Sequence, residues 1–370
     1  MVNRKRLVDS FVNLIKIDSL SKQERQMADE LKSILEGMGF SVYEDNAGEK
    51  IEGNAGNLIC TVKGSKDVPP ILLMAHMDTV TPGKGKTPVI EDGIIKSDGT
   101  TILGRDDVAG IACILETLRV IKENAVEHGD IQVVFTVAEE VGLMGAKALD
   151  YTKINAKYGF VLDEGGEIGS VAVKAPSQNI IDITVKGKAS HAGIAPEKGV
   201  SAIQIAAEAI SNMKLGRIDH ETTANIGIIK GGQATNIVCD VVEIKAEARS
   251  RDKEKLDRQT AHMRECMEKA AEKFGGTADF KAELEYPSFV INENDDIVKI
   301  LRKAAAAAGL EFRLKETGGG SDTNIINGMG IQAVNVSVGM DKVHSVNEQI
   351  KIDDMVRAVE FLVEIVKAVE

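Results

Sequence analysis

The chain has 370 residues, 43% of them hydrophobic, and a formal net charge of −12 from 45 basic and 57 acidic side chains. This length predicts two domains of ordinary size. The negative charge, the lack of tryptophan and the 4% aromatic content disfavour binding to nucleic acid or to anionic membranes. No apolar run approaches the ~18 residues that a membrane-spanning helix needs.

The cysteines point to a reducing compartment. Cys60, Cys113, Cys239 and Cys266 are scattered and form no C-x-x-C pair, which predicts small core residues and no disulfide frame. The basic N-terminus runs into apolar residues at helical spacing and has no secretory pattern. We therefore expect a cytoplasmic protein with neither a nucleic-acid nor a membrane partner.

Residues 1–174 alternate predicted strands and helices, the pattern of an α/β domain with a mostly parallel, mixed sheet flanked by helices. The same pattern resumes in residues 288–370. Strands are predicted at 71–75, 131–138, 159–162 and 331–338, and helices at 107–124, 295–308 and 353–369. Together these two ranges predict one discontinuous domain.

The middle of the chain, residues 175–287, has a different order. Its predicted elements are strand 179–185, helix 201–213, strand 222–229, strand 237–248, helix 252–274 and strand 278–286. This β-α-β-β-α-β order predicts an inserted ferredoxin-like α+β domain.

Ionisable side chains gather where the predicted strands of the first domain end. Asp106 opens a helix after a glycine-containing turn, and the others follow or end apolar runs: His76, Asp78, Glu139, Glu140, Asp163 and His344. The carboxyl ends of such strands form the ligand crevice of open α/β sheets. Because several carboxylates in one crevice repel one another, the cluster predicts one or two divalent metal ions. Imidazole and carboxylate ligands without thiolates suit zinc, cobalt or manganese.

Each pair of residues also has a structural interpretation. His76 and Asp78 alone favour a loop histidine with a capping aspartate, and Asp106-Asp107 is a good helix start. Glu139-Glu140 alone fits a surface turn. In an extended segment adjacent side chains point opposite ways, so one glutamate can bind metal while the other acts as a general base. Asp78, two residues after His76, can accept a hydrogen bond from the imidazole. His128, His220 and His262 are interpreted as solvated histidines.

Four segments taken together resemble the M20 family of metallopeptidases, the aminoacylase/carboxypeptidase group, and most of all its peptidase T-like tripeptidases. They are Met-Ala-His-Met-Asp-Thr-Val at 74–80, Leu-Gly-Arg-Asp-Asp-Val-Ala-Gly at 103–110, Ala-Glu-Glu-Val-Gly at 138–142 and Asp-Glu-Gly-Gly at 163–166. The resemblance implies two zinc ions per chain, with cobalt or manganese as substitutes. His76, Asp106 and Asp163 would hold one ion, with Asp106 bridging to a second held by Glu140 and His344. Glu139 would be the catalytic base, and Asp78 the partner of His76. Many members have lysine where Val108 stands, so Val108 is given no role.

The resemblance extends to the inserted domain, which it describes as a lid and dimerisation domain. His191, in Ser-His-Ala-Gly at 190–193, would help to polarise the scissile carbonyl, often in the site of the partner subunit of a homodimer. Asn236 and Arg249 would hold the substrate carboxylate, a role that suits a planar guanidinium. Gly319 and Gly320, in Gly-Gly-Gly-Ser-Asp at 318–322, would line the substrate end of the pocket. No Gly-Lys-Ser/Thr follows them, so this segment is not a P-loop.

These features predict a two-metal exopeptidase that acts on short peptides, a tripeptide aminopeptidase. An N-acyl-amino-acid amidohydrolase or a dipeptidase with the same site is the nearest alternative. A catalytically silent metal-binding or scaffold protein is disfavoured, because such a protein has no need of the free base Glu139. A Rossmann-type nucleotide binder is disfavoured by the lack of G-x-G-x-x-G after the first strand.

Overall fold

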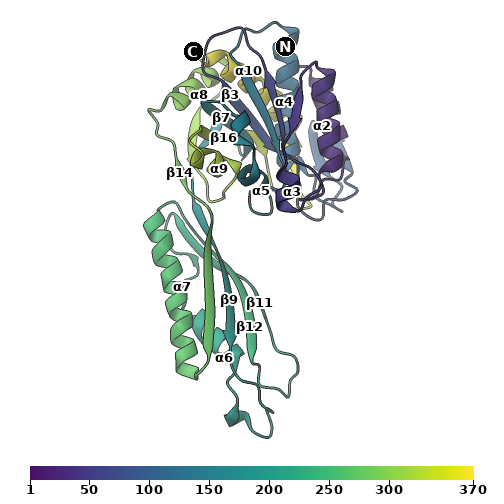
Figure 1. Cartoon of the computed structure of the whole chain (residues 1–370). Helices are drawn as coiled ribbons and strands as arrows, with labels where there is room; N and C mark the ends of the chain where they lie inside the picture. Colours follow the sequence, from purple (N-terminus) through teal and green to yellow (C-terminus); the bar gives the residue numbers. More distant parts are fainter. The chain divides into compact units, whose positions relative to one another are not determined.

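The computed structural model describes residues 1–370, and the chain divides into two units (Figure 1). Unit 1 comprises Met1–Val173, Val290–Glu316 and Ser321–Glu370. Unit 2 comprises Lys174–Phe289 and Thr317–Gly320. None of the helices is both long enough and apolar enough to cross a membrane.

The main sheet of unit 1 has nine strands in the order β1-β2-β6-β3-β7-β16-β8-β14, with β15 paired to β8. They are β1 (Val42–Glu44), β2 (Leu58–Val62), β3 (Ile71–His76), β6 (Ile131–Thr136), β7 (Tyr158–Gly165), β8 (Ser170–Ala175), β14 (Phe289–Val290), β15 (Arg313–Glu316) and β16 (Gln332–Met340). Neighbours among β6, β3, β7 and β16 pair in parallel, whereas β1–β2, β2–β6 and β16–β8 are antiparallel. The expected α/β class with a mixed sheet, parallel at its centre, is confirmed.

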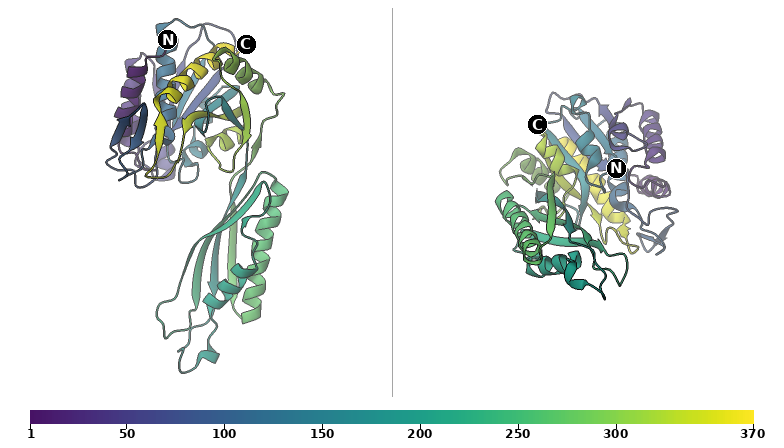
Figure 2. Two further views of the ribbon diagram at one scale, coloured as in Figure 1. Left: turned by 180° about the vertical axis from the view of Figure 1, so that it is seen from behind. Right: turned by 60° about the horizontal axis from the view of Figure 1, so that its bottom comes forward.

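Helices cover both faces of this sheet. They are α1 (Arg4–Ile15), α2 (Arg25–Gly37), α3 (Ala47–Ile51), α4 (Arg105–Glu123), α5 (Met144–Ala148), α8 (Asp296–Ala307), α9 (Asp322–Gly328) and α10 (Ile352–Ala368). Helices α4 and α10 pack against each other and against the sheet, and α9 and α5 lie on the opposite face (Figure 2). A small sheet of order β17-β5-β4 joins β4 (Pro88–Glu91), β5 (Ile94–Ser97) and β17 (Gln349–Lys351).

Helix α4 is buried on nearly every side. The sequence pattern predicts one apolar stripe along 107–124, but every residue from Arg105 to Leu118 is buried. The helix packs against the sheet, α1 and α10 at once, so little of its surface is left for solvent. Its first residues therefore place charged side chains inside the molecule. His128 also differs from its prediction as a solvated residue: it is buried, and its Nδ1 lies 2.6 Å from the Gly129 carbonyl oxygen.

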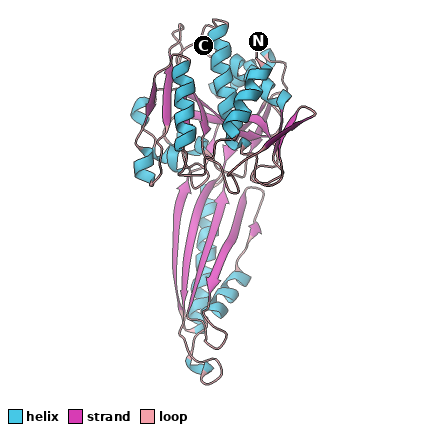
Figure 3. Ribbon diagram, turned by 90° about the vertical axis from the view of Figure 1, so that its right-hand side faces the viewer, coloured by secondary structure: helices cyan, strands magenta, loops and turns pink.

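Unit 2 contains one antiparallel sheet of order β10-β11-β12-β9-β13 (Figure 3). Its elements are β9 (Ser177–Lys186), α6 (Ala202–Asn212), β10 (Gly216–Arg217), β11 (Thr222–Gly231), β12 (Val241–Ser250), α7 (Lys253–Phe274) and β13 (Thr277–Tyr286). This order is the ferredoxin-like arrangement with one short extra edge strand. Alternate residues of β9, such as Ile181, Ile183 and Val185, are buried in a core shared with α6 and α7. The role of this unit as a lid stays a prediction.

Candidate metal centre

Three of the side chains predicted from the sequence, His76, His344 and Glu140, gather around the carboxylate of a fourth, Asp106. Its Oδ1 lies 3.1 Å from Nε2 of His76 at the end of β3. Its Oδ2 lies 3.3 Å from Nε2 of His344, in the loop after β16, and the same nitrogen is 2.9 Å from Oε1 of Glu140. Each oxygen of one carboxylate thus faces a different imidazole, an arrangement that suits a carboxylate shared by two cations.

Asp163 groups with His76 and Asp107. Ligand atoms of His76, Asp107 and Asp163 lie within 4.8 Å of one another, as do those of His76, Asp106 and Glu140. The buried carboxylate of Asp107 accepts from the backbone N–H of His76 (3.3 Å) and of Gly110 (3.1 Å). It therefore caps helix α4, as the sequence allowed, and also orients the strand end that carries His76.

The partner of His76 differs in part from the prediction. Nδ1 of His76 lies 2.9 Å from the backbone carbonyl oxygen of Asp78, whereas the Asp78 carboxylate is 3.5 Å away. The imidazole N–H therefore donates to the main chain, which leaves Nε2 directed at Asp106. This is the tautomer that a metal-binding imidazole needs.

The Asp78 carboxylate instead holds the turn after β6. Four consecutive backbone N–H groups of this turn, residues 137–140, donate to buried side-chain oxygens, and we call the segment the anchored turn. The bonds are Val137 to Asn57 (3.1 Å), Ala138 to Glu24 (2.9 Å), Glu139 to Asp78 Oδ1 (2.9 Å) and Glu140 to Asp78 Oδ2 (3.2 Å). The hydroxyl of Ser21 donates to Asp78 as well (2.6 Å). Glu139 and Glu140 are thus fixed through their main chain.

Sequence reasoning missed Ser21, Glu24 and Asn57. The spacing Ser21-x-x-Glu24 before an apolar helix is that of a helix-capping box. Glu24 does stand at the N-cap of α2, but its side chain makes no capping bond and accepts from Ala138 in the anchored turn. Nothing local in the sequence tells a glutamate that caps its own helix from one that binds a distant turn.

The electrostatics of the cluster fit a bound cation. Burial, together with neighbouring acids, raises the pKa of both Glu139 and Asp163 well above the usual carboxyl value. Hydrogen bonds from His344 to Asp106 and Glu140 raise the pKa of that imidazole to about 10. The buried carboxylates therefore repel one another when ionised, and a bound cation would neutralise their charge. With imidazole nitrogens and carboxylate oxygens as donors, the residues match the ligand preference of zinc, cobalt or manganese.

The remaining predicted residues lie in unit 2. His191 and Asn236 are exposed on neighbouring loops, where the N–H of Ala192 donates to the Asn236 carbonyl (2.9 Å) and His191 forms a β-bridge with Ile237. Arg249, on β12, makes two bonds to the carboxylate of Glu247, at 3.0 and 2.9 Å. The Nε/Nη2 edge of its guanidinium therefore already has a carboxylate partner.

The glycine segment packs tightly. A Cβ on Gly320 would lie 2.1 Å from the ring of Tyr286, so only glycine fits this position, whereas a Cβ on Gly319 would meet only the Thr317 hydroxyl, at 3.9 Å. The structure thus gives Gly320 a packing reason of its own. The chain then passes into unit 1, where buried Asp322 accepts from the Thr136 hydroxyl (2.6 Å).

Comparison with known proteins agrees with this geometry. The family model described as peptidase family M20/M25/M40 matches residues 72–368. The chain is 48% identical to YqjE of Bacillus subtilis over 367 residues, 99% of each chain. The crystal structure of aminopeptidase PepT from Bacillus cereus has a TM-score of 0.91 and 47% identity, covering 99% of both chains. A tripeptidase structure from Staphylococcus aureus has a TM-score of 0.95 and 44% identity, covering 99% of this chain and 98% of that one.

A central parallel sheet with a cluster of imidazoles and carboxylates at its strand ends defines a metallopeptidase fold and site. The chain belongs to peptidase family M20/M25/M40, and the resemblance inferred from its motifs is confirmed.

Proposed function

We propose that this chain is an aminopeptidase that uses two divalent cations, preferably zinc, to release the N-terminal residue of tripeptides. The observation that carries the proposal is the Asp106 carboxylate, with one oxygen toward His76 and the other toward His344. The likeness to solved structures named as an aminopeptidase and a tripeptidase supports the substrate class.

The residues of the cluster have two proposed roles: five are metal ligands, and Glu139 is the general base. His76, Asp106 and Asp163 would hold one cation, and Asp106, Glu140 and His344 the other. Cations bound there would polarise the peptide carbonyl and make water a better nucleophile at neutral pH. Glu139, buried beside these ligands, would take the proton of the attacking water and pass it to the leaving amine. The anchored turn keeps its carboxylate in place through the main chain.

Two measurements test this function. Metal analysis after mild dialysis should find close to two divalent ions per chain, and a chelator should abolish activity. Tripeptides should be cleaved faster than dipeptides or N-acetyl-amino acids in a matched panel. Preference for N-acetyl substrates would assign the amidohydrolase alternative, and full activity without metal would overturn the metallopeptidase proposal.

We further propose that unit 2 forms a homodimer in which His191, with Asn236, serves the partner's site. Strand β11 supports an interface: on this strand, β10 and the residues after it bond only to Thr222, Thr223 and Ala224, so the edge from residue 225 to 231 has no neighbouring strand on that side. Two large apolar side chains on it, Ile228 and Ile229, are 45% and 53% exposed. An open apolar edge is a site for pairing with another chain.

Mixing two inactive variants tests the action in trans. After subunit exchange between Glu139→Gln and His191→Ala, each mixed dimer would hold one site with an intact base and an intact histidine. About a quarter of wild-type activity should return, since half of the dimers are mixed and one of two sites in each is complete. No recovery after demonstrated exchange would place His191 in its own chain or outside catalysis.

A further inference from the structure

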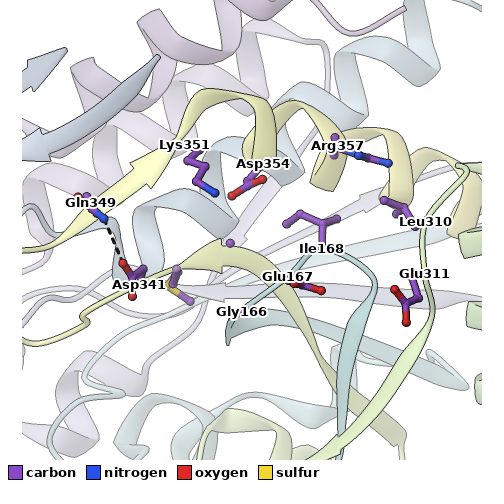
Figure 4. Close-up of a pocket in the computed structure, with 12 residues that line it drawn as sticks. Gly166, Glu167, Ile168, Leu310, Glu311, Asp341, Gln349, Lys351, Asp354 and Arg357 are labelled. Atoms are coloured by element: carbon purple, nitrogen blue, oxygen red, sulfur yellow. Dashed lines mark hydrogen bonds between the residues drawn. The ribbon is translucent and has the colours of Figure 1, made fainter. Parts of the chain in front are cut away.

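His344 stands on an exposed loop with an unusual backbone. Residues 341–348, which we call the His344 loop, connect β16 to β17, and the His344 side chain is 49% exposed. The φ angles of Lys342 and His344 are both +61°, a left-handed conformation that residues other than glycine adopt only when their surroundings hold them. At the base of the loop Gln349 donates to Asp341 (3.1 Å), beside a cavity of about 510 Å³ that both residues line (Figure 4).

One buried carboxylate joins this loop to the start of helix α4. Glu348 is only 1% exposed, and its two oxygens accept from two main-chain N–H groups. Oε1 accepts from His344 at 2.9 Å, and Oε2 accepts from Gly104 at 2.7 Å. Gly104 stands two residues before Asp106, so a single side chain ties together two segments that each supply a residue of the candidate metal centre.

A second buried charge accompanies it. The guanidinium of Arg105 is completely buried, and none of its three nitrogens has a hydrogen-bond partner. Burial lowers the pKa of Arg105 to about 10, and Glu348 is the carboxylate that opposes this effect most strongly, ahead of Asp106 and Asp341. A buried charge without hydrogen bonds is costly unless an opposite charge compensates for it. The two buried charges therefore stabilise each other without a hydrogen bond between them.

We propose that Glu348 is a positioning residue that sets the separation of His344 from Asp106, with Arg105 as its buried counter-charge. The inference rests on the proposed metal-dependent function, because it assigns to Glu348 control chiefly over the second cation, the one that His344 would bind. Of the residues that would hold the first cation, His76 and Asp163 have no bond to Glu348, and only the shared ligand Asp106 lies near the tether at Gly104. The first cation should therefore depend on Glu348 less than the second.

The decisive variant is Glu348→Gln. Glutamine keeps the shape of the side chain but offers only one acceptor oxygen, so its amide NH₂ would face a second N–H donor. One of the two tethers must break, and Arg105 loses its counter-charge. Loss of a group that orients a metal ligand typically weakens metal binding by about 10–100-fold. We expect a loss of this size for one of two Zn²⁺ binding steps and a clearly smaller loss for the other.

Glu116→Gln is the matched control. Glu116 lies on α4, the helix that begins at Arg105, and like Glu348 it is buried. Its carboxylate accepts from the side chain of Arg6 and from the N–H of Asn3, and neither of these residues is near a metal ligand in sequence. Both variants and wild type would be stripped of metal, titrated with Zn²⁺ by calorimetry and compared by thermal unfolding. Glu116→Gln should bind both ions as wild type does. Equal weakening of both steps in Glu348→Gln, or none, would overturn the inference.

A measurement on wild-type protein covers the case in which Glu348→Gln fails to fold. Hydrogen exchange resolved at single amides should show His344 and Gly104 protected at least about 10-fold more than Val343, whose N–H makes no hydrogen bond within the chain. Exchange of His344 as fast as Val343 would overturn the inference. Wild type that binds no metal would instead overturn the proposed function, so the two failures are distinct.

Discussion

The anchored turn and the His344 loop both supply residues to the same cluster, but they are built differently. The turn is held by four consecutive main-chain bonds to buried side chains, and Glu139 is 8% exposed. The loop is largely exposed, and one buried carboxylate ties it to the rest of the unit.

This difference in anchoring matches two different requirements of a metallopeptidase site, one for the general base and one for the metal ligands. A general base must stand in a fixed position relative to the reacting atoms, since an error of about 1 Å can cost 100-fold in rate. A terminal metal ligand, in contrast, is itself drawn into place by the cation. We therefore expect loss of the bonds that anchor the turn to affect catalysis and stability, and loss of the bonds that hold the loop to affect metal affinity.

The largest effect should come from Glu139→Gln. Removal of the general base should lower kcat by about 10²–10⁴-fold, because no other group can accept the proton of water as readily. The metal content should stay near that of wild type, since this carboxylate is not assigned as a ligand. Steady-state kinetics with a tripeptide and metal analysis of the same sample check both parts.

The neighbouring Glu140→Gln and His76→Ala are the controls, and both should lose metal together with activity. If Glu139→Gln keeps most of its activity, the base has been assigned to the wrong residue.

Asp78→Asn should have the next largest effect. Asparagine can accept at one oxygen only, whereas the carboxylate accepts from Ser21, Glu139 and Glu140. At least one buried N–H would lose its partner, which costs about 1–3 kcal/mol in the free energy of unfolding. Urea unfolding of the metal-free protein measures this cost, and kcat should fall as well. Unfolding at the wild-type midpoint with unchanged kcat would show that the turn is rigid without Asp78.

Glu24→Gln should stabilise the protein at neutral pH. Burial, with the neighbouring Asp78, raises the pKa of Glu24 to about 7, and its Oε2 has no hydrogen-bond partner. Between the ordinary value of 4.5 and about 7 the folded chain binds this proton and the unfolded chain does not, so stability falls as pH rises across that window.

Glutamine removes this penalty. The variant should match wild type near pH 4.5 and exceed it above pH 7 by up to about 3 kcal/mol in the metal-free protein. Thermal unfolding against pH checks the sign, with the exposed Glu254→Gln as a control. A constant difference at every pH would show that the pKa of Glu24 is the same in the folded and the unfolded chain.

Gln349→Ala should have the smallest effect. It removes one bond to Asp341 at the exposed base of the His344 loop, a change of about 0.5 kcal/mol or less in the free energy of unfolding. A Zn²⁺ titration should be the same as that of wild type, because the tether through Glu348 is untouched. A marked loss of Zn²⁺ affinity would show that the bond between Gln349 and Asp341, and not Glu348, holds the His344 loop in place.

The sequence predicts the strands well because their signals are local. Apolar runs end at His76, Glu139 and Asp163, and parallel pairing of β3 with β6 and β7 brings these ends to one edge of the sheet. The motifs also predict the family.

The supporting residues could not be predicted in the same way. Glu24, Asn57 and Glu348 act through side-chain bonds to the main chain of residues that lie 114, 80 and 244 positions away, and such pairs leave no spacing in the sequence. The hydrogen bond from His76 to the backbone carbonyl of Asp78 could not be predicted either. Every residue has a carbonyl, and only the local backbone conformation decides which one accepts from the imidazole.

The chain leaves unit 1 and re-enters it at adjacent points: the N–H of Ile291 donates to the carbonyl of Val173 at 2.8 Å. Residues 174–289 are therefore an insertion whose two ends meet in unit 1. The entropy cost of closing such a loop grows only slowly with its length. A short reverse turn in place of residues 174–289 should let the sheet of unit 1 form. On the roles proposed for His191 and Asn236, the shortened chain should keep its metal binding and lose peptide hydrolysis.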